Sequence, residues 1–292
     1  MVKKFSQLYL DARRAFMEIE DQERASLLAR NLLCYVSGKS QEAIIADREK
    51  YACETVCEAM ETAVQRIVAE EPLAYVLGEW NFYGLPLYVD HNVLIPRDDT
   101  CAVAGLAIKR GLFLEQDPRI LDLCTGSGCI GIAVANRVKD AKVTLADISK
   151  EALAVARRNI SRHKLSGRVS CVQADALAPA SAFLGKFDMI VSNPPYVTTA
   201  EMEELPKSVK DYEPHLALHG GTDGLDFYRS IIKNYTSALK PGGYLCFEFG
   251  MGQGNAVCDL LIKNGYTILE RSNDYNNIER AVIAQYAGKD EI

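Results

Sequence analysis

Long apolar runs are absent from the sequence, and with them the usual signal for a membrane-spanning helix. Mostly apolar stretches such as Phe187–Val191 are far shorter than the roughly 18 to 20 residues that a membrane span needs. The first residues, MVKKFSQLYLDARRAF, are interrupted by charges, unlike the apolar region of a secretory signal peptide. We therefore predict a cytoplasmic protein with no membrane span and no signal peptide.

Paired cysteine motifs are missing as well. The nine cysteines are an odd number without C-x-x-C spacing, in a chain too large to need disulfide bonds for stability. We predict that they are reduced, small, buried side chains. Cys53 and Cys57 lie four residues apart in a helical pattern, but His163, His215 and His219 are remote in sequence. These spacings do not match those of structural zinc sites, so no metal is expected.

A surplus of positive charge is also missing. The formal net charge is -6 at pH 7, whereas proteins that bind nucleic-acid backbones do so through lysine and arginine. Stable nucleic-acid binding is therefore not expected. The 292 residues are 48% hydrophobic and 25% charged, which is typical of a globular chain long enough for a large core or two domains.

The N-terminal part of the chain has a helical pattern. Between Gln7 and Glu70, apolar residues recur three and four positions apart among charged ones, as on one face of an amphipathic helix. Gly38 and Pro72 are typical residues at or just beyond helix ends. Residues 1–75 are therefore predicted to form a small helical domain.

A short segment of strand character follows. In EWNFYGLPLYVDHNVLIPR, residues 79–97, aromatic and branched side chains alternate around Gly84-Leu85-Pro86, which is typical of a hairpin. We predict a hairpin-like connector over residues 76–97 and a second domain over residues 98–292.

Short apolar strands alternate with helices in the second domain. Strands are predicted at 119–123, 141–147, 168–175, 187–193 and 242–250, and helices at 130–138, 149–164 and 226–239. Such alternation implies βαβ crossovers and a mainly parallel, doubly wound, Rossmann-like α/β sheet with helices on both faces. The last two strands, 266–272 and 279–286, are joined by a loop alone, so we expect them to pair antiparallel at one edge.

Glycine or carboxylate residues follow the first three strands of this sheet. Open α/β sheets bind ligands beyond the carboxyl ends of their strands, where the strand order reverses. The first loop contains Asp122, Cys124, Thr125, Gly126, Ser127 and Gly128, and its glycines let a ligand lie against the backbone at a helix N-terminus. The next strands end at Asp147 and at Asp175-Ala176. A carboxylate about twenty residues after a glycine loop is placed to accept hydrogen bonds from ribose hydroxyls.

Simpler interpretations stay open for the same residues. The glycine loop could be an ordinary tight turn between a strand and a helix. Asp147 could cap the helix that begins near Ser149, although Ser149 itself could supply that cap.

Two cofactor classes fit this arrangement, nicotinamide dinucleotides and S-adenosylmethionine. The dinucleotide fingerprint fits only if Gly126, Gly128 and Gly131 are taken as its glycines, and Asp122 at the mouth of the loop would repel a pyrophosphate. A carboxylate there would instead attract the ammonium group of a methionine moiety. The pattern therefore favours S-adenosylmethionine.

The fourth strand stops abruptly at Asn193-Pro194-Pro195-Tyr196. Proline has no N–H to continue a sheet ladder, and its ring fixes φ. This rigid backbone would let the Asn193 side-chain oxygen and the Pro194 carbonyl accept hydrogen bonds from one planar amino group, while Tyr196 offers a flat face for stacking. The alternative is a rigid turn with no chemical role.

These residues resemble the signatures of one enzyme class. Asn193–Tyr196 is similar to the Asn-Pro-Pro-Tyr signature of amino-methyltransferases, and DLCTGSGCIGIAVA, residues 122–135, looks like their donor-binding loop. With the N-terminal helical part, three further stretches make the chain resemble the peptide chain release factor glutamine methyltransferases, which are class I S-adenosylmethionine-dependent enzymes. These stretches are residues 72–97, 212–232 and 239–253.

The chain departs from the pattern of that family at three places. Pro96-Arg97-Asp98-Asp99-Thr100-Cys101 stands where the family usually reads Pro-Arg-Pro-Glu-Thr-Glu. Cys124 replaces the first loop glycine, and because positive φ is unfavourable for cysteine we expect the closest approach to the donor at Gly126 and Gly128. Asn277 stands where glycine is usual, and asparagine tolerates the left-handed region.

The resemblance implies a reaction and a site. A methyl group would pass from S-adenosylmethionine to the side-chain amide nitrogen of the glutamine in the Gly-Gly-Gln loop of class I release factors. The catalytic residues would be Asn193 and Pro194, and the substrate-binding residues Asn193, Pro194, Pro195 and Tyr196. The donor would contact Asp122, Cys124, Thr125, Gly126, Ser127, Gly128, Asp147, Asp175, Ala176 and Asn193. Residues 1–75 would recognise the substrate, 98–292 would bind the donor and carry the reaction, and Glu248 could assist or be an unrelated carboxylate.

Two other functions stay open at this stage. In a nucleic-acid adenine methyltransferase, Asn193–Tyr196 would bind the exocyclic amino group of a flipped-out base in the same way. Such an enzyme would need a basic groove, which this acidic chain does not obviously offer. A non-catalytic module that binds a translation factor would not need Asn193–Tyr196 together with Asp122 and Asp147.

Overall fold

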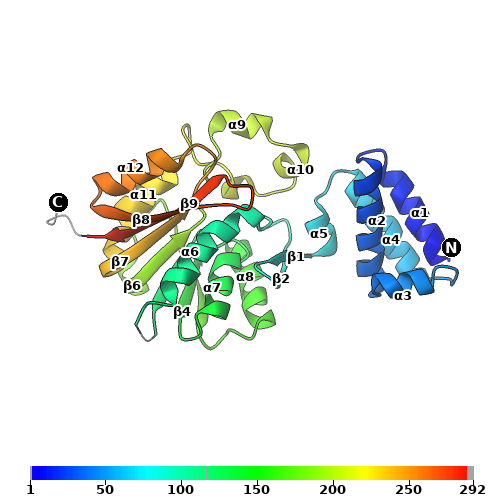
Figure 1. Cartoon of the computed structure of the whole chain (residues 1–292), viewed down its shortest axis with the longest axis horizontal. Helices are drawn as coiled ribbons and strands as arrows, with labels where there is room; N and C mark the ends of the chain where they lie inside the picture. Colours follow the sequence, from blue (N-terminus) through cyan, green and yellow to red (C-terminus); the bar gives the residue numbers. More distant parts are fainter. Residues whose placement is uncertain (1, 116, 288–292) are drawn as a thin grey trace. The chain divides into compact units, whose positions relative to one another are not determined.

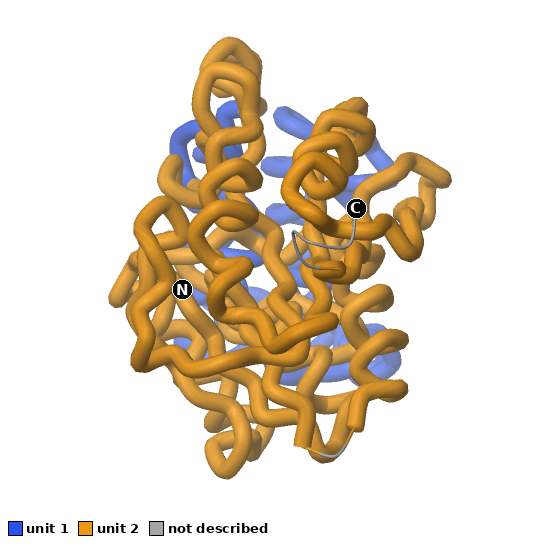
Figure 2. Tube along the Cα trace, turned by 90° about the vertical axis from the view of Figure 1, so that its left-hand side faces the viewer, with its two compact units in different colours: residues 1–78, 207–212 blue, residues 79–206, 213–292 orange. Residues whose placement is uncertain are grey.

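The computed structural model describes residues 2–115 and 117–287. The chain divides into two compact units (Figure 2), residues 1–78 with 207–212 and residues 79–206 with 213–292. No helix in the described ranges is both long and apolar enough to cross a membrane.

The first unit is built from helices. They are α1 (Phe5–Phe16), α2 (Gln22–Ser37), α3 (Gln41–Ala46), α4 (Glu54–Val68), α5 (Leu73–Leu77) and, from later in the chain, α10 (Lys207–Lys210). Asp21 caps α2 by accepting hydrogen bonds from two backbone N–H groups. Gly38 ends this helix in the left-handed conformation, as the sequence predicts. α1, α2 and α4 bury a common apolar core that includes Phe16, Leu32 and Met60. The predicted helical character of this part is thus confirmed.

A two-stranded hairpin, β1 (Glu79–Phe82) and β2 (Leu85–Tyr88), opens the second unit. Its turn residues are Tyr83 and Gly84, with φ of 53° and 78°, as a two-residue hairpin turn of type I′ requires. The predicted turn at Gly84-Leu85-Pro86 lay slightly too far along the chain, because Leu85 and Pro86 already pair in β2. An isolated ribbon tolerates a proline without an N–H because part of its backbone is not bonded to a neighbouring strand.

The second unit is built around a seven-stranded sheet. Its strands are β3 (Arg119–Leu123), β4 (Lys142–Asp147), β5 (Val169–Gln173), β6 (Phe187–Ser192), β7 (Leu239–Glu248), β8 (Tyr266–Asn273) and β9 (Glu279–Tyr286), in the order β5-β4-β3-β6-β7-β9-β8. β3 to β7 run parallel, and β9 is antiparallel to both β7 and β8. The predicted doubly wound sheet with an antiparallel edge is confirmed. The strand order reverses between β3 and β6, which is where such sheets bind ligands.

Helices cover both faces of the sheet (Figure 1). α6 (Cys101–Gly111), α7 (Cys129–Arg137) and α8 (Lys150–Arg162) pack on one face, and α11 (Asp226–Tyr235) and α12 (Gly254–Lys263) on the other. Neighbouring strand residues alternate between the two cores: Ile120 is buried in the first and Leu121 in the second, because successive side chains of a strand point to opposite faces. The remaining elements are α9 (Thr199–Glu204), η1 (Asp98–Thr100), η2 (Ala182–Leu184), η3 (His215–Ala217) and η4 (Thr236–Ala238).

Candidate active site

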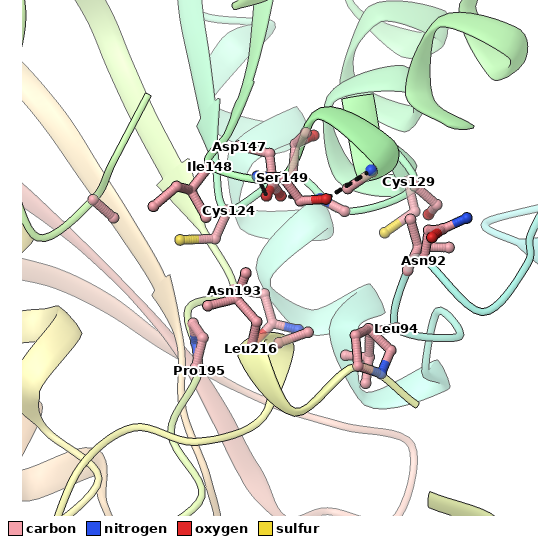
Figure 3. A pocket seen from close by; sticks show the side chains of 18 of the residues that line it. Asn92, Leu94, Cys124, Cys129, Asp147, Ile148, Ser149, Asn193, Pro195 and Leu216 are labelled. Atoms are coloured by element: carbon pink, nitrogen blue, oxygen red, sulfur yellow. Dashed lines mark hydrogen bonds between the residues drawn. The ribbon is translucent and has the colours of Figure 1, made fainter. Parts of the chain in front are cut away.

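A cavity lies at the carboxyl ends of β3, β4, β5 and β6, where the strand order reverses (Figure 3). Most of the residues predicted from the strand ends line it: Cys124, Thr125, Gly126, Ser127, Asp147, Asp175, Ala176, Asn193 and Pro195. Asp122, Gly128, Pro194 and Tyr196 are not part of its lining. The sheet topology therefore brings together side chains from four strand ends that are far apart in sequence.

Asp122 lies beneath the glycine loop and not at its mouth. The residue is fully buried, and its Oδ2 accepts hydrogen bonds from Thr125 Oγ1 at 2.6 Å and from the Gly131 backbone N–H at 2.8 Å. The expectation that this carboxylate faces the ammonium of a ligand is corrected by this position. Helices cover both faces of the sheet, so the side chains of β3 beyond its first residue are buried on either face. The hydrogen bonds of Asp122 join the glycine loop to the start of α7.

Burial raises the pKa of Asp122 to about 7, although Thr125 and Gly131 lower it by hydrogen bonding. The folded state therefore holds a proton that the unfolded chain, with a carboxyl pKa near 4, has already lost. We expect the free energy of unfolding to fall as the pH rises from about 4 to about 7, by at most on the order of 4 kcal/mol from this group. Asp122→Asn should lose that part of the pH dependence and be more stable than the unmutated protein at pH 8, as measured by denaturant unfolding. Equal pH dependence in both proteins would contradict a protonated, buried Asp122.

Cys124 adopts the positive φ that is unfavourable for a cysteine. Its φ is 61°, followed by 53° at Gly126 and 85° at Gly128, so the loop uses three left-handed residues and not two. Left-handed backbone costs a residue other than glycine about 1 kcal/mol. The surrounding structure offsets this, because Thr125 N–H donates to Ala146 O at 3.0 Å and the Cys124 side chain packs against the second core.

Asp147 lines the cavity, and its carboxylate can accept hydrogen bonds beyond those it already makes. Its Oδ2 accepts from the Gly126 N–H at 2.9 Å and its Oδ1 from the Ser149 N–H at 3.0 Å. Burial raises the pKa of Asp147, and these N–H groups lower it. Ser149 itself caps α8 through Ala152 N–H at 3.0 Å, so the helix does not depend on Asp147 for its cap. Each carboxylate oxygen keeps a further lone pair for a ligand.

Asn159 fixes the other side of the loop, and sequence reasoning missed it. It is fully buried in α8. Its Nδ2 donates to Ser127 O and Tyr88 O, both at 2.9 Å, and its Oδ1 accepts from Tyr88 N–H at 2.7 Å. Every polar group of the amide is thereby engaged in joining the loop to the hairpin. A lone asparagine in a helical pattern carries no signal of this kind.

Asn193 and Pro195 reach the cavity from the end of β6. Ser192 Oγ donates to Leu123 O at 2.6 Å, which locks the ends of β6 and β3 together. Asn193 Nδ2 donates to Thr100 Oγ1 at 3.3 Å, so the amide nitrogen is turned toward η1. Burial raises the pKa of the Tyr196 hydroxyl, which keeps this phenol neutral.

Three glycines lie close to the backbone and side chains of the segment after β6. A Cβ at Gly220 would lie 2.6 Å from Pro195 O, one at Gly224 would lie 2.3 Å from Tyr196 O, and one at Gly250 would lie 3.1 Å from the Tyr196 ring. These glycines belong to the stretches 212–232 and 239–253 on which the family resemblance rests. Their lack of a side chain lets two loops approach the rigid Pro-Pro backbone closely.

The cavity also has walls that the strand-end argument could not find. Asn92, Val93, Leu94 and Pro96 come from the segment after the hairpin, and Thr100 comes from η1. Ile148 is one position after Asp147, and Leu177 is two positions after Asp175. Pro214, Leu216 and Ala217 come from the segment around η3. Glu213 joins two of these segments, because it pairs with Arg97 and its Oε2 accepts from Ile95 N–H at 3.2 Å. Asp99, in the departing stretch 96–101, pairs with Arg280 at 2.9 Å.

Metal ligands are not assembled in the described ranges, where no group of three or more His, Cys, Asp or Glu side chains is placed to hold an ion. The nine cysteines are all unpaired.

Two family models match the chain. Residues 109–209 match the methyltransferase small domain, and residues 7–78 match the PrmC N-terminal domain. Among curated proteins, the release factor glutamine methyltransferase of Chlorobaculum tepidum is 39% identical over 274 residues, which cover 92% of each chain. That of Geobacter sulfurreducens is 37% identical over 275 residues, which cover 94% of each chain.

Among solved structures, a methyltransferase from Pyrococcus furiosus superposes with a TM-score of 0.51 at 20% identity. The match covers 78% of this chain and 100% of that chain. At this level of identity the likeness concerns the fold alone.

Proposed function

Because the chain belongs to the family of release factor glutamine methyltransferases, we propose that it methylates the glutamine side-chain amide in the Gly-Gly-Gln loop of class I peptide chain release factors. The methyl donor is S-adenosylmethionine, and the reaction takes place in the cavity at the ends of β3 to β6.

The lining of the cavity fits this donor in chemical kind. The carboxylate oxygens of Asp147 can accept hydrogen bonds from two ribose hydroxyls. The side chains of Ile148 and Leu177 give an apolar surface for a purine. The loop from Cys124 to Gly128 leads into the N-terminus of α7, which favours an anionic group such as the donor carboxylate. When bound, S-adenosylmethionine supplies a methyl group made electrophilic by its sulfonium.

Asp147→Ala should weaken donor binding while the glycine loop keeps its other supports. A charge-assisted hydrogen bond to a hydroxyl contributes about 1.5 to 3 kcal/mol, so the dissociation constant should rise roughly ten- to a hundredfold. Titration calorimetry with S-adenosylmethionine measures this directly. Ser149→Ala is a matched control, because it removes the cap of α8 and leaves the carboxylate in place. Unchanged affinity in Asp147→Ala would remove Asp147 from the donor site.

The acceptor amide poses the chemical difficulty. Its nitrogen is a poor nucleophile, because the lone pair is delocalised into the carbonyl. We propose that Asn193 Oδ1 and the Pro194 carbonyl oxygen accept hydrogen bonds from the two N–H groups of the substrate amide. These bonds hold the amide nitrogen in line with the methyl group and stabilise the positive charge that develops on it. Pro195 has no N–H that could compete. The methylated nitrogen becomes acidic and releases one proton to water, so a strong base is not required.

The observation that carries this proposal is that Asn193 and the loop from Cys124 to Ser127 line one cavity. Labelled methyl from the donor should therefore enter purified release factor. The same assay with RNA should give no incorporation, because a net charge of -6 does not favour binding to a phosphate backbone. Label in RNA and none in the factor would overturn the proposal.

We also propose that the protein acts in the cytoplasm, where translation termination takes place.

We further propose that the helical unit recognises the release factor. Two points support this role of the helical unit. The described helices of this unit contribute no residue to the cavity, and a protein substrate needs a surface beyond a small pocket.

A further inference from the structure

Glu248 is a buried carboxyl group that the proposed chemistry does not use. It is the last residue of β7 and only 1% exposed. β7 runs parallel to β6 with Phe247 opposite Ser192, so Glu248 and Asn193 leave neighbouring strands at the same level. The Tyr228 hydroxyl holds the Glu248 backbone carbonyl at 2.8 Å. A carboxyl group therefore lies directly behind the amide that is proposed to hold the substrate.

Thr100 and Asn193 are polar side chains that neighbour this carboxyl group. Burial raises the pKa of Glu248 to about 8, and hydrogen bonding with Thr100 and Asn193 lowers it. Asn193 Nδ2 also donates to Thr100 Oγ1 at 3.3 Å. Glu248 Oε2 has no hydrogen-bond partner among the residues that the structure describes. The three side chains thus form a connected polar group at the back of the cavity.

The donors and acceptors of this group specify one orientation of Asn193. An asparagine amide has an accepting end and a donating end of nearly equal size. Asn193 Nδ2 donates to Thr100 Oγ1, which leaves the Thr100 hydroxyl hydrogen for an oxygen of Glu248. The carbonyl oxygen of that carboxyl group accepts whether or not the other oxygen carries a proton. The amide nitrogen is then held at the back, and the oxygen is left to face the cavity. A reversed amide would present N–H groups to the N–H groups of the substrate.

We propose that Glu248 and Thr100 are positioning residues that hold the Asn193 amide with its oxygen toward the substrate. This inference rests on the proposed function, because it concerns the hydrogen bond between Asn193 and the amide nitrogen of the substrate. Neither residue is required to touch the reacting atoms. Their contribution passes through Asn193.

The position of Glu248 is unfavourable for stability. Burying a carboxyl group with one oxygen unpartnered destabilises the folded state, and a well-packed apolar side chain of similar size often restores stability. Asp99 and Arg280 also face the group, the first raising and the second lowering the pKa of Glu248. A residue kept only for packing would lose stability on replacement, whereas Glu248 should not.

The test compares Glu248→Met with Glu248→Gln. Methionine has a similar length and no acceptor oxygen, whereas glutamine keeps one. We expect Glu248→Met to reduce the single-turnover rate of methyl transfer to release factor about ten- to a hundredfold, with unchanged donor binding by calorimetry and an equal or higher denaturant midpoint at pH 7.5. Glu248→Gln should restore the rate to within about threefold of the unmutated protein. The pair Thr100→Val and Thr100→Ser should repeat this loss and rescue, so the test stands even if Glu248→Met fails to fold.

A second arm asks whether the effect passes through Asn193. In an Asn193→Ala background there is no amide left to orient, so adding Glu248→Met should change the rate little. Coupling of this kind is what a double-mutant cycle measures. An equal loss in both backgrounds would overturn the inference and assign Glu248 a separate role.

The remaining outcomes are also decisive. If the unmutated protein transfers methyl to the factor and both Glu248→Met and Thr100→Val match its rate, the inference is wrong and the proposed function stands. If activity falls only in proportion to stability, the two residues are structural and the inference is again wrong. If the unmutated protein transfers no methyl group, the proposed function fails and this inference with it.

Discussion

Asn193→Ala should slow methyl transfer to release factor by about 10²- to 10³-fold, the usual effect of removing one preorganised electrostatic contact. The variant loses the side-chain acceptor but keeps the proline-fixed backbone and the Pro194 carbonyl, so the substrate nitrogen is held by one acceptor and not two. The fold should survive, because Ser192 still locks β6 to β3. Single-turnover assays at saturating donor isolate the chemical step. Transfer at the unmutated rate would reduce Asn193 to a strand terminator.

Asn193→Asp is the matched comparison. It keeps an oxygen of nearly the same shape, adds negative charge and removes the N–H that Asn193 donates to Thr100. The charge favours a positive nitrogen in the transition state, but it also favours the bound sulfonium in the ground state. We therefore expect an intermediate rate, above that of the alanine variant and below that of the unmutated protein. Calorimetry with the donor separates the ground-state part of this effect.

Removal of residues 1–78 should reduce kcat/KM for the methylation of intact release factor by about a hundredfold or more. Such a loss corresponds to roughly 3 kcal/mol of binding energy, which a few well-buried contacts of a protein interface supply. The sheet, the glycine loop and the cavity all lie in the other unit, so donor binding should persist.

A short peptide that contains Gly-Gly-Gln is the control substrate for this truncation. It is too small to use a second recognition surface, so the truncated and full-length proteins should methylate it at similar rates. Residues 207–212 cluster with the removed unit, and circular dichroism should therefore verify that the remainder is folded. If the truncated protein methylates the intact factor as fast as the full chain, substrate recognition lies elsewhere.

Much of the fold follows from periodicity. Apolar residues three and four apart predict α2 and α4, and short apolar runs that alternate with helices predict the parallel sheet and its antiparallel edge. The rule that ligands bind where the strand order reverses then places Cys124, Asp147 and Asn193 around one cavity, which the structure contains. These predictions succeed because each depends on local pattern or on general topology.

The predictions that failed depend on details of the backbone. Whether a side chain at a strand end points to the cavity or into the core is decided by one step of alternation, and that step buries Asp122. The positive φ of Cys124 is imposed by contacts across the loop and not by its own preference. The hairpin turn at Tyr83 and Gly84 was misplaced because Pro86, a usual turn residue, lies in a strand.

Other site residues could not be found from sequence because their partners are distant along the chain. Thr100 reaches Asn193, and Glu213 reaches Arg97 and Ile95, only once the sheet is assembled. The stretches that carry these residues do contribute to the family resemblance. A resemblance indicates that such residues belong together without saying which atoms meet.

The central claim is that this cavity transfers a methyl group to one glutamine amide, and mass spectrometry of the substrate tests it most directly. Release factor is incubated with the protein and S-adenosylmethionine, digested, and its Gly-Gly-Gln peptide is sequenced by fragmentation. We predict a mass increase of one methylene group, located on the glutamine side chain and absent when the donor is omitted. An unmodified Gly-Gly-Gln peptide, or a methyl group on any other residue, would contradict the account.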